Sequence, residues 1–218
     1  MSLSGAGLLG GPVFFVLWFV GAQTLFFATG GTIDETPLPT RDEFPNVLLT
    51  HQSGAYLGAT MLLLAAGSLL WFAAGLRDRV GPGSSLGLVA VLGATGVAIL
   101  LVLEGGLVVA SVNIAEDTPE LAWLVYRLSG AVGFESVGST FLGAVTVTGV
   151  LAASPRNTIP RWFWWLTAVF GAALVAGSIL EGFGIGPDGR FPIFFGLWAF
   201  IAGFTLLAKP GTSLSTSD

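Results

Sequence analysis

Four ionisable side chains lie inside long apolar stretches of the chain, where a charge is costly to place. Three are acids, Glu104, Glu135 and Glu181, and one is a base, Arg127. An ionised group that faces lipid costs at least about 2.5–3.5 kcal/mol, so we expect these side chains to face protein. Because a guanidinium binds a carboxylate in bidentate fashion, we predict that Arg127 pairs with Glu104 or Glu181.

The rise of an α-helix places three of these groups at a similar depth. At about 1.5 Å per residue, Glu104 and Glu181 lie about 27 and 28 Å from the side with most basic residues, and Arg127 lies about 6 Å below the opposite interface. Tyr126 adjoins Arg127, and His51 begins an apolar stretch on that side. These groups predict an outward-facing polar pocket for a small solute, an ion or a lipid headgroup. Alternatively, the charges only fix the register of the helices.

Glu135 and His51 each allow two interpretations. Glu135 lies about 18 Å below the outer interface, close to the middle of the membrane. A lone carboxyl at that depth suits proton coupling, or it is a neutral acid bonded to neighbouring backbone. His51 is an interfacial residue, or it senses pH beside an acidic loop.

The composition indicates an integral membrane protein. Of its 218 residues, 53% are hydrophobic and 10% are charged, whereas soluble domains average about 25% charged residues. The net charge of −5 argues against nucleic acid as a partner. Without cysteine and with one histidine, thiolate and multi-histidine metal sites are excluded. Known catalytic motifs are missing from the sequence, so we expect no enzyme, no catalytic residues and no cofactor.

Six apolar stretches must position these side chains, and they predict a single all-α transmembrane domain over residues 1–218. A helix needs about 20 residues to cross a bilayer core about 30 Å thick. The predicted spans are residues 12–29, 51–76, 86–112, 121–153, 162–182 and 192–208. The fourth is too long for a straight crossing, so it tilts, extends past the membrane or breaks at one of its glycines.

The charges of the loops predict the orientation. The loops on one side carry Arg77, Arg79, Arg156, Arg161 and Lys209, whereas acidic residues dominate the loops on the other side. Cytoplasmic loops carry the excess of Lys and Arg. We therefore expect both termini in the cytoplasm, with the protein in the cell (plasma) membrane.

Short sequence repeats favour a duplicated helical hairpin. Leu-Glu-Gly occurs at residues 103–105 and again at 180–182, and Ser-Gly-Ala occurs at 53–55 and 129–131. The spacings are 77 and 76 residues, so spans two and three correspond to spans four and five. The alternative is that small residues recur by chance in membrane helices.

Two features carry a resemblance to a known class. They are the acidic loop that leads to His51 and the sequence Ile-Pro-Arg-Trp-Phe-Trp-Trp-Leu at residues 159–166. In this layout the chain resembles small six-pass membrane proteins of bacteria and archaea that are assigned to domains of unknown function. The resemblance implies a prokaryotic multi-pass membrane protein and no particular activity.

Two functions remain open from the sequence. One is a binding or transport-like protein that takes a small polar ligand or a proton through the polar pocket. The other is a structural or accessory subunit, whose buried charges stabilise the bundle and whose partner is another membrane protein or a second copy. In both, the lipid bilayer is a partner.

Overall fold

In the part of the chain that the structure describes, all regular elements are helices. The computed structural model describes residues 3–31, 39–80, 84–134, 136–154, 159–185 and 191–208. Glu135, Arg156 and Lys209, which the sequence analysis uses, lie outside these ranges. The helices are α1 (Leu3–Leu8), α2 (Gly10–Ala28), α3 (Phe44–Thr50), α4 (Gln52–Val80), α5 (Ser85–Ile114), α6 (Pro119–Val132), α7 (Val137–Ala153), α8 (Arg161–Gly182) and α9 (Pro192–Ala208).

Five helical segments are long and apolar enough to cross a membrane, which is the pattern of a multi-pass membrane protein. They are Ala6–Ala28, Gln52–Val80, Ser85–Ile114, Pro119–Ala153 and Arg161–Gly182. The predicted sixth span coincides with α9, an apolar helix of 17 residues and thus about 25 Å in length. This helix is shorter than the roughly 30 Å core of a bilayer.

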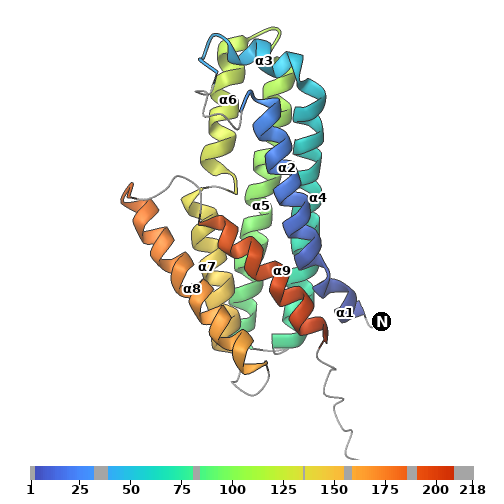
Figure 1. Ribbon diagram of the computed structural model, residues 1–218, viewed down its shortest axis with the longest axis vertical. Coiled ribbons are helices and arrows are strands. Elements are labelled where there is room, and N and C mark those ends of the chain that lie inside the picture. The colour runs from blue at the N-terminus through green and yellow to red at the C-terminus, as the bar shows by residue number, and fades with distance from the viewer. Residues whose placement is uncertain are drawn as a thin grey trace, which may run out of the picture.

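The long helices α2, α4 and α5 run side by side along the long axis of the molecule (Figure 1). α6 and α7 follow one another along this axis, and both pack against α5. α8 and α9 lie obliquely, toward the end opposite to α3. α4 packs between α2 and α5, and α7 packs between α5 and α8, so helices that are neighbours in sequence are mostly neighbours in space.

The predicted fourth span is interrupted at a glycine, which is one of the three alternatives that the sequence allows for this long stretch. α6 ends at Val132 with Gly133 as its C-cap, and α7 begins at Val137. Gly133 has an extended backbone, with φ −74° and ψ −165°. α6 therefore ends at a glycine, and a separate helix begins at Val137.

Neighbouring side chains bind the backbone groups that this interruption exposes. The Ser136 side chain accepts a hydrogen bond from the Ser139 N–H at 3.3 Å, and the Ser139 hydroxyl donates to the carbonyl of Phe134. The Glu104 carboxylate on α5 accepts from the Phe134 N–H at 2.8 Å. A non-helical segment is tolerated within a membrane domain when the protein supplies such partners.

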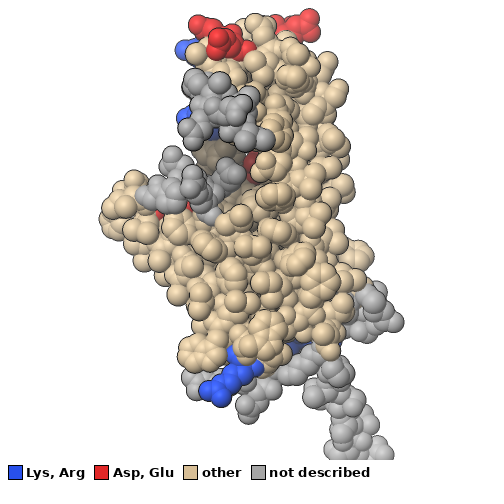
Figure 2. Space-filling view, in the orientation of Figure 1, with Lys and Arg blue, Asp and Glu red and all other residues tan. Residues whose placement is uncertain are grey.

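Charged side chains gather at the two ends of the molecule (Figure 2). The end that holds α3 and the start of α6, which we call the acidic end, has exposed acids. The opposite end carries arginines at the end of α4 and the start of α8. The acids are Asp42, Glu43, Glu116, Asp117 and Glu120, and the arginines are Arg77, Arg79 and Arg161. Two further arginines, Arg41 and Arg127, lie at the acidic end and line a pocket there.

Candidate functional site

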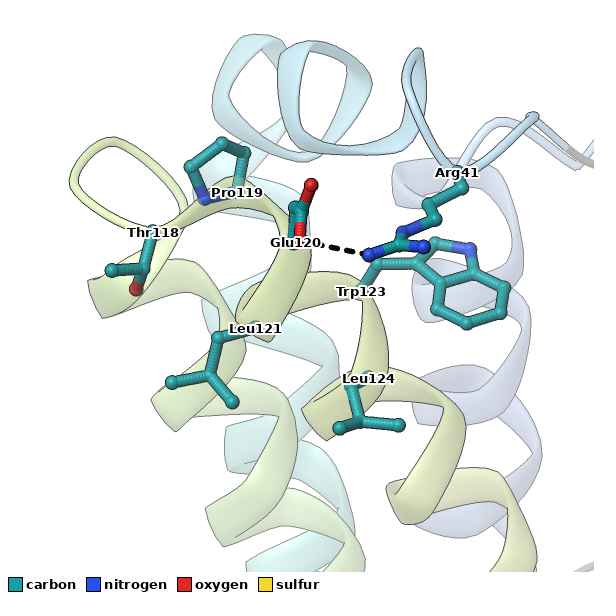
Figure 3. Close-up of a pocket in the computed structure, with 7 residues that line it drawn as sticks. All are labelled: Arg41, Thr118, Pro119, Glu120, Leu121, Trp123 and Leu124. Carbon is teal, nitrogen blue, oxygen red and sulfur yellow. Dashed lines mark ion pairs between the residues drawn. The ribbon is translucent and has the colours of Figure 1, made fainter.

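Two adjoining pockets open at the acidic end. The smaller, the arginine pocket, has a volume of about 190 Å³. The larger, the α6 groove, has a volume of about 550 Å³ and follows the start of α6 (Figure 3). The arginine pocket is lined by Thr29, Pro39, Thr40, Arg41, Phe44, Trp123, Tyr126 and Arg127, and the α6 groove by Arg41, Thr118, Pro119, Glu120, Leu121, Trp123 and Leu124. Arg41 and Trp123 therefore form a wall that the two pockets share.

Arg127 is the cation of this site that lacks an acidic partner within the described residues. It lies one helical turn after Trp123 on α6, and its guanidinium carbon is 5.6 Å from the centroid of the Trp123 ring. Stacking on an aromatic face leaves the edge of the guanidinium and its N–H donors available. The side chain is exposed. It can therefore offer several donors to an anion in the arginine pocket.

Arg41 reaches the pocket from the loop before α3. Its guanidinium forms an ion pair with Glu120 at 2.9 Å (Figure 3). The two side chains are 55% and 81% exposed, so the ion pair contributes little to stability, about 0–1 kcal/mol. Its consequence is electrostatic, because Arg41 offsets the charge of the acid at the start of α6 that would otherwise repel an anion.

Tyr126 joins three elements around the arginine pocket. Its hydroxyl donates to Thr29 Oγ1 at 3.1 Å, while Thr29 donates to the carbonyl of Leu25 at 2.8 Å. The Tyr126 ring packs against Phe44 on α3, with ring centroids 4.7 Å apart. The end of α2, the short helix α3 and α6 are thereby held together, which gives the pocket fixed walls.

A local cap orders the loop that carries Arg41. The Glu43 carboxylate accepts hydrogen bonds from the Thr40 N–H at 3.0 Å and from the Thr40 hydroxyl at 2.8 Å. The backbone bond first, and the hydroxyl bond second, lower the pKa of Glu43 below its ordinary value of 4.5. The Glu43 carboxylate thereby fixes Thr40, which lines the arginine pocket.

This lowered pKa predicts a pH dependence of stability. A carboxylate whose pKa is depressed on folding stabilises the folded state above its unfolded pKa, and this contribution is lost as the pH falls through the folded value. We expect the wild type to unfold at a higher temperature than Glu43→Gln at pH 7, with a difference that shrinks below about pH 4.5. Thermal unfolding of both proteins between pH 3 and 7 tests this. In a Thr40→Ala background the difference should be smaller, and an unchanged difference at pH 3 would contradict the cap.

Glu104 lies at the helix interruption and lines neither pocket. Besides its bond to the Phe134 N–H, its carboxylate packs so closely on Gly133 that a Cβ there would lie 2.5 Å from Glu104 Oε2. Gly133 is therefore the residue that lets this carboxylate reach the backbone. The arrangement ties α5 to the junction of α6 and α7.

Substitution of Glu104 should destabilise the fold, and the effect should be larger when the new side chain has no hydrogen-bond acceptor. Glu104→Ala leaves the Phe134 N–H without its acceptor, which we expect to cost about 1–2 kcal/mol because Glu104 is half-buried. Glu104→Gln keeps a carbonyl oxygen and should cost less. Denaturant unfolding in dodecyl maltoside measures both, with Glu116→Ala, an exposed acid just beyond α5, as the matched control. Equal effects of Glu104→Ala and Glu116→Ala would refute this role.

Glu181 and His51 line neither pocket. Glu181 lies in the last turn of α8, and its two carboxylate oxygens are buried without a hydrogen-bond partner among the described residues. His51 is exposed at the junction of α3 and α4, where its backbone N–H bonds to the carbonyl of Val47. Glu135, the other predicted site residue, lies outside the described ranges.

The predicted ion pair of Arg127 with Glu104 or Glu181 is wrong. Between described residues, the ion pair within 4.0 Å joins Arg41 to Glu120. For Glu104 the physical reason is competition, because Trp123 holds the guanidinium of Arg127 and the Phe134 backbone holds the carboxylate of Glu104. Of the predicted site residues, the structure brings together Arg127 and Tyr126.

The sequence analysis misses Arg41, Thr29, Thr40 and Phe44 as pocket residues. One signal was available, since Arg41 is the single basic residue in the acidic stretch from Asp34 to Glu43. The described residues contain no group of three or more His, Cys, Asp or Glu side chains that could hold a metal ion. The donors that the pocket offers are therefore the guanidinium N–H groups of its arginines.

Comparison of the chain with protein-family models, with curated proteins and with solved structures finds no match. The resemblance in layout to six-pass prokaryotic proteins stays an interpretation of the sequence. What the protein does must therefore be inferred from the pocket itself.

Proposed function

We propose that this protein is a binding or transport-like protein of the cell membrane, whose arginine pocket takes an anionic group from outside the cell. In this proposal the chain crosses the membrane six times, α9 included, with both termini in the cytoplasm. The arginines at the end of α4 and the start of α8 support this orientation, because basic residues are enriched on the cytoplasmic side. The acidic end, with both pockets, then faces outward.

The observation that carries the proposal is the position of Arg127 in the pocket wall, unpaired with any acid among the described residues. A phosphate, sulfonate or carboxylate accepts two parallel N–H bonds from a guanidinium, and such charge-assisted bonds are about twice as strong as neutral ones. Thr40 and Tyr126 also line this pocket of about 190 Å³, but their hydroxyls donate to Glu43 and Thr29, so the donors left for an anion are the guanidinium N–H groups. This set fits a small group with several acceptor oxygens.

The acids around the pocket do not oppose this assignment. Glu120 is paired with Arg41 at 2.9 Å, and Glu43 accepts two hydrogen bonds from Thr40. The cation of Arg41 offsets the charge of Glu120, whereas Glu43 is bound by neutral donors and lies outside the lining of both pockets. The cation on Arg127 therefore remains the uncompensated charge of the pocket wall in the described part of the chain.

Binding of inorganic phosphate tests the proposal. We expect saturable binding to the full-length protein in dodecyl maltoside, measured by isothermal titration calorimetry, and about tenfold weaker binding to Arg127→Gln. Arg161→Gln removes an exposed arginine at the opposite end of the molecule and is the matched control. Equal binding by wild type and Arg127→Gln, or no saturable binding at all, would refute the proposal.

A structural subunit is the second candidate, and the position of Glu104 favours it. Its carboxylate binds the backbone of the helix interruption and lines neither pocket, so this half-buried acid stabilises the bundle. Under this alternative, Arg127→Gln leaves phosphate binding unchanged, and the protein co-purifies with a stoichiometric membrane partner.

A further inference from the structure

We propose that the anion belongs to a membrane amphiphile, with its phosphate in the arginine pocket and its hydrocarbon chain in the α6 groove. This inference rests on the proposed function and names the class of ligand. The two pockets adjoin at the side chains of Arg41 and Trp123, so a molecule that passes over these two side chains occupies both. A free phosphate would use only the smaller pocket.

The α6 groove supplies an apolar track beside the cations. Leu121 and Leu124 line the groove and are 47% and 58% exposed. Leu128, 49% exposed, follows Leu124 by four residues and thus lies on the same face of α6. In Figure 3 the two labelled leucines lie below the Arg41–Glu120 ion pair, toward the middle of α6. An acyl chain along them would run from the acidic end toward the centre of the bilayer.

The charges and the side chains along α6 match the two ends of a phospholipid. Trp123, Glu120 and Arg127 occupy one side of the helix, and Leu121, Leu124 and Leu128 occupy the adjacent side, as the helical period of 3.6 residues places them. Tryptophan is enriched at the level of lipid headgroups, and basic pockets between membrane helices bind anionic headgroups. Leu121 and Leu124 precede Arg127 along α6 and Leu128 follows it, so the hydrocarbon contacts lie beside the headgroup contacts around the helix.

Three probes distinguish an amphiphile from a free anion: inorganic phosphate, dodecyl phosphate and uncharged dodecanol. Each is titrated into full-length protein in dodecyl maltoside, and the heat from protein-free micelles is subtracted. Dodecyl maltoside carries no phosphate and so does not compete for the arginines. We expect dodecyl phosphate to bind at least about tenfold more tightly than inorganic phosphate, and dodecanol to bind weakly.

Two variants separate the charge from the chain. Arg127→Gln should weaken the binding of both phosphates. The double variant Leu121→Ala/Leu124→Ala should weaken the binding of dodecyl phosphate by about tenfold and leave the binding of inorganic phosphate unchanged. Leu92→Ala/Leu103→Ala on α5 is the matched control, because these leucines are also exposed, by 59% and 48%. This control should bind all probes as the wild type does.

The outcomes separate this inference from the proposed function. If Arg127→Gln weakens the binding of both phosphates but Leu121→Ala/Leu124→Ala weakens the binding of neither, the ligand is a free anion and the amphiphile inference is refuted. If dodecyl phosphate and dodecanol bind equally, the groove binds hydrocarbon alone, and the amphiphile assignment fails as well. If neither phosphate depends on Arg127, the proposed function fails and this inference fails with it.

Discussion

Phe134→Ala is expected to lower the free energy of unfolding by about 3 kcal/mol, the lower end of the range for buried phenylalanines. Phe134 lies in the helix interruption and is 1% exposed. Its ring contacts Trp18, Phe14 and Phe195, with centroids 4.5, 5.7 and 6.4 Å apart. Removal of the ring leaves a cavity between α2, α9 and the α6–α7 junction. We take the lower end because lipid or detergent, being as apolar as the core, weakens the transfer contribution.

Phe141→Ala is the matched control for this prediction. Phe141 lies on α7 within the same predicted span and is 57% exposed, so its removal takes away few protein contacts. We expect its free energy of unfolding to stay within about 0.5 kcal/mol of the wild type. Denaturant titration followed by tryptophan fluorescence measures both variants. If Phe134→Ala costs no more than Phe141→Ala, the interruption is not anchored by this ring.

The same interruption connects the fold to the candidate site. α6 carries Trp123, Tyr126 and Arg127, and its lower end is fixed by Phe134 and by the Glu104 carboxylate. Its middle is fixed by the hydrogen bond from the Tyr126 hydroxyl to Thr29. We therefore expect Phe134→Ala also to weaken phosphate binding, although Phe134 lines neither pocket, because α6 loses its lower anchor.

Much of the helix pattern follows from the sequence, because the hydropathy of a membrane helix is a local property. The predicted stretch 192–208 coincides with α9, and 162–182 differs from α8 by one residue. The sequence gives the break at a glycine as one of three alternatives, since the apolar character of span four continues across Gly133. The sequence analysis misses the short helix α3, because its mixed sequence lies before the predicted span 51–76.

The site was harder to predict, because depth along a helix does not give direction around it. Helical rise places Glu104 and Arg127 in the same part of the membrane, but it does not show that Trp123 lies under the guanidinium. Arg41 was missed because it belongs to a loop, whose position depends on the contacts of Tyr126, Phe44 and Thr29 rather than on hydropathy. Such long-range contacts have no periodic signature in the sequence.

Gly10→Ala should destabilise the protein by about 2–3 kcal/mol, because it places a methyl group against the backbone of another helix. Gly10 is the first residue of α2, where this helix approaches α4. A Cβ at this position would lie 2.7 Å from the backbone nitrogen of Phe72 and would also press on the carbonyl oxygen of Ser68. Backbone atoms of a packed helix cannot rotate away as a flexible side chain can. α2 and α4 must therefore separate, and overpacking of this kind costs about 1–3 kcal/mol.

Gly67→Ala provides the contrast on the facing helix. Gly67 lies next to Ser68 on α4, but a Cβ there would meet no atom within 4 Å. Alanine favours helix over glycine by about 0.5–1 kcal/mol, so this variant should be neutral or slightly more stable than the wild type. The two substitutions are therefore expected to change stability differently. Gly10→Ala reports the close approach of α2 to α4, whereas Gly67→Ala reports helix propensity alone. If denaturant unfolding gives both variants the stability of the wild type, α2 and α4 are not in contact through Gly10, and the packing that positions the end of α2 beside Tyr126 must be redrawn.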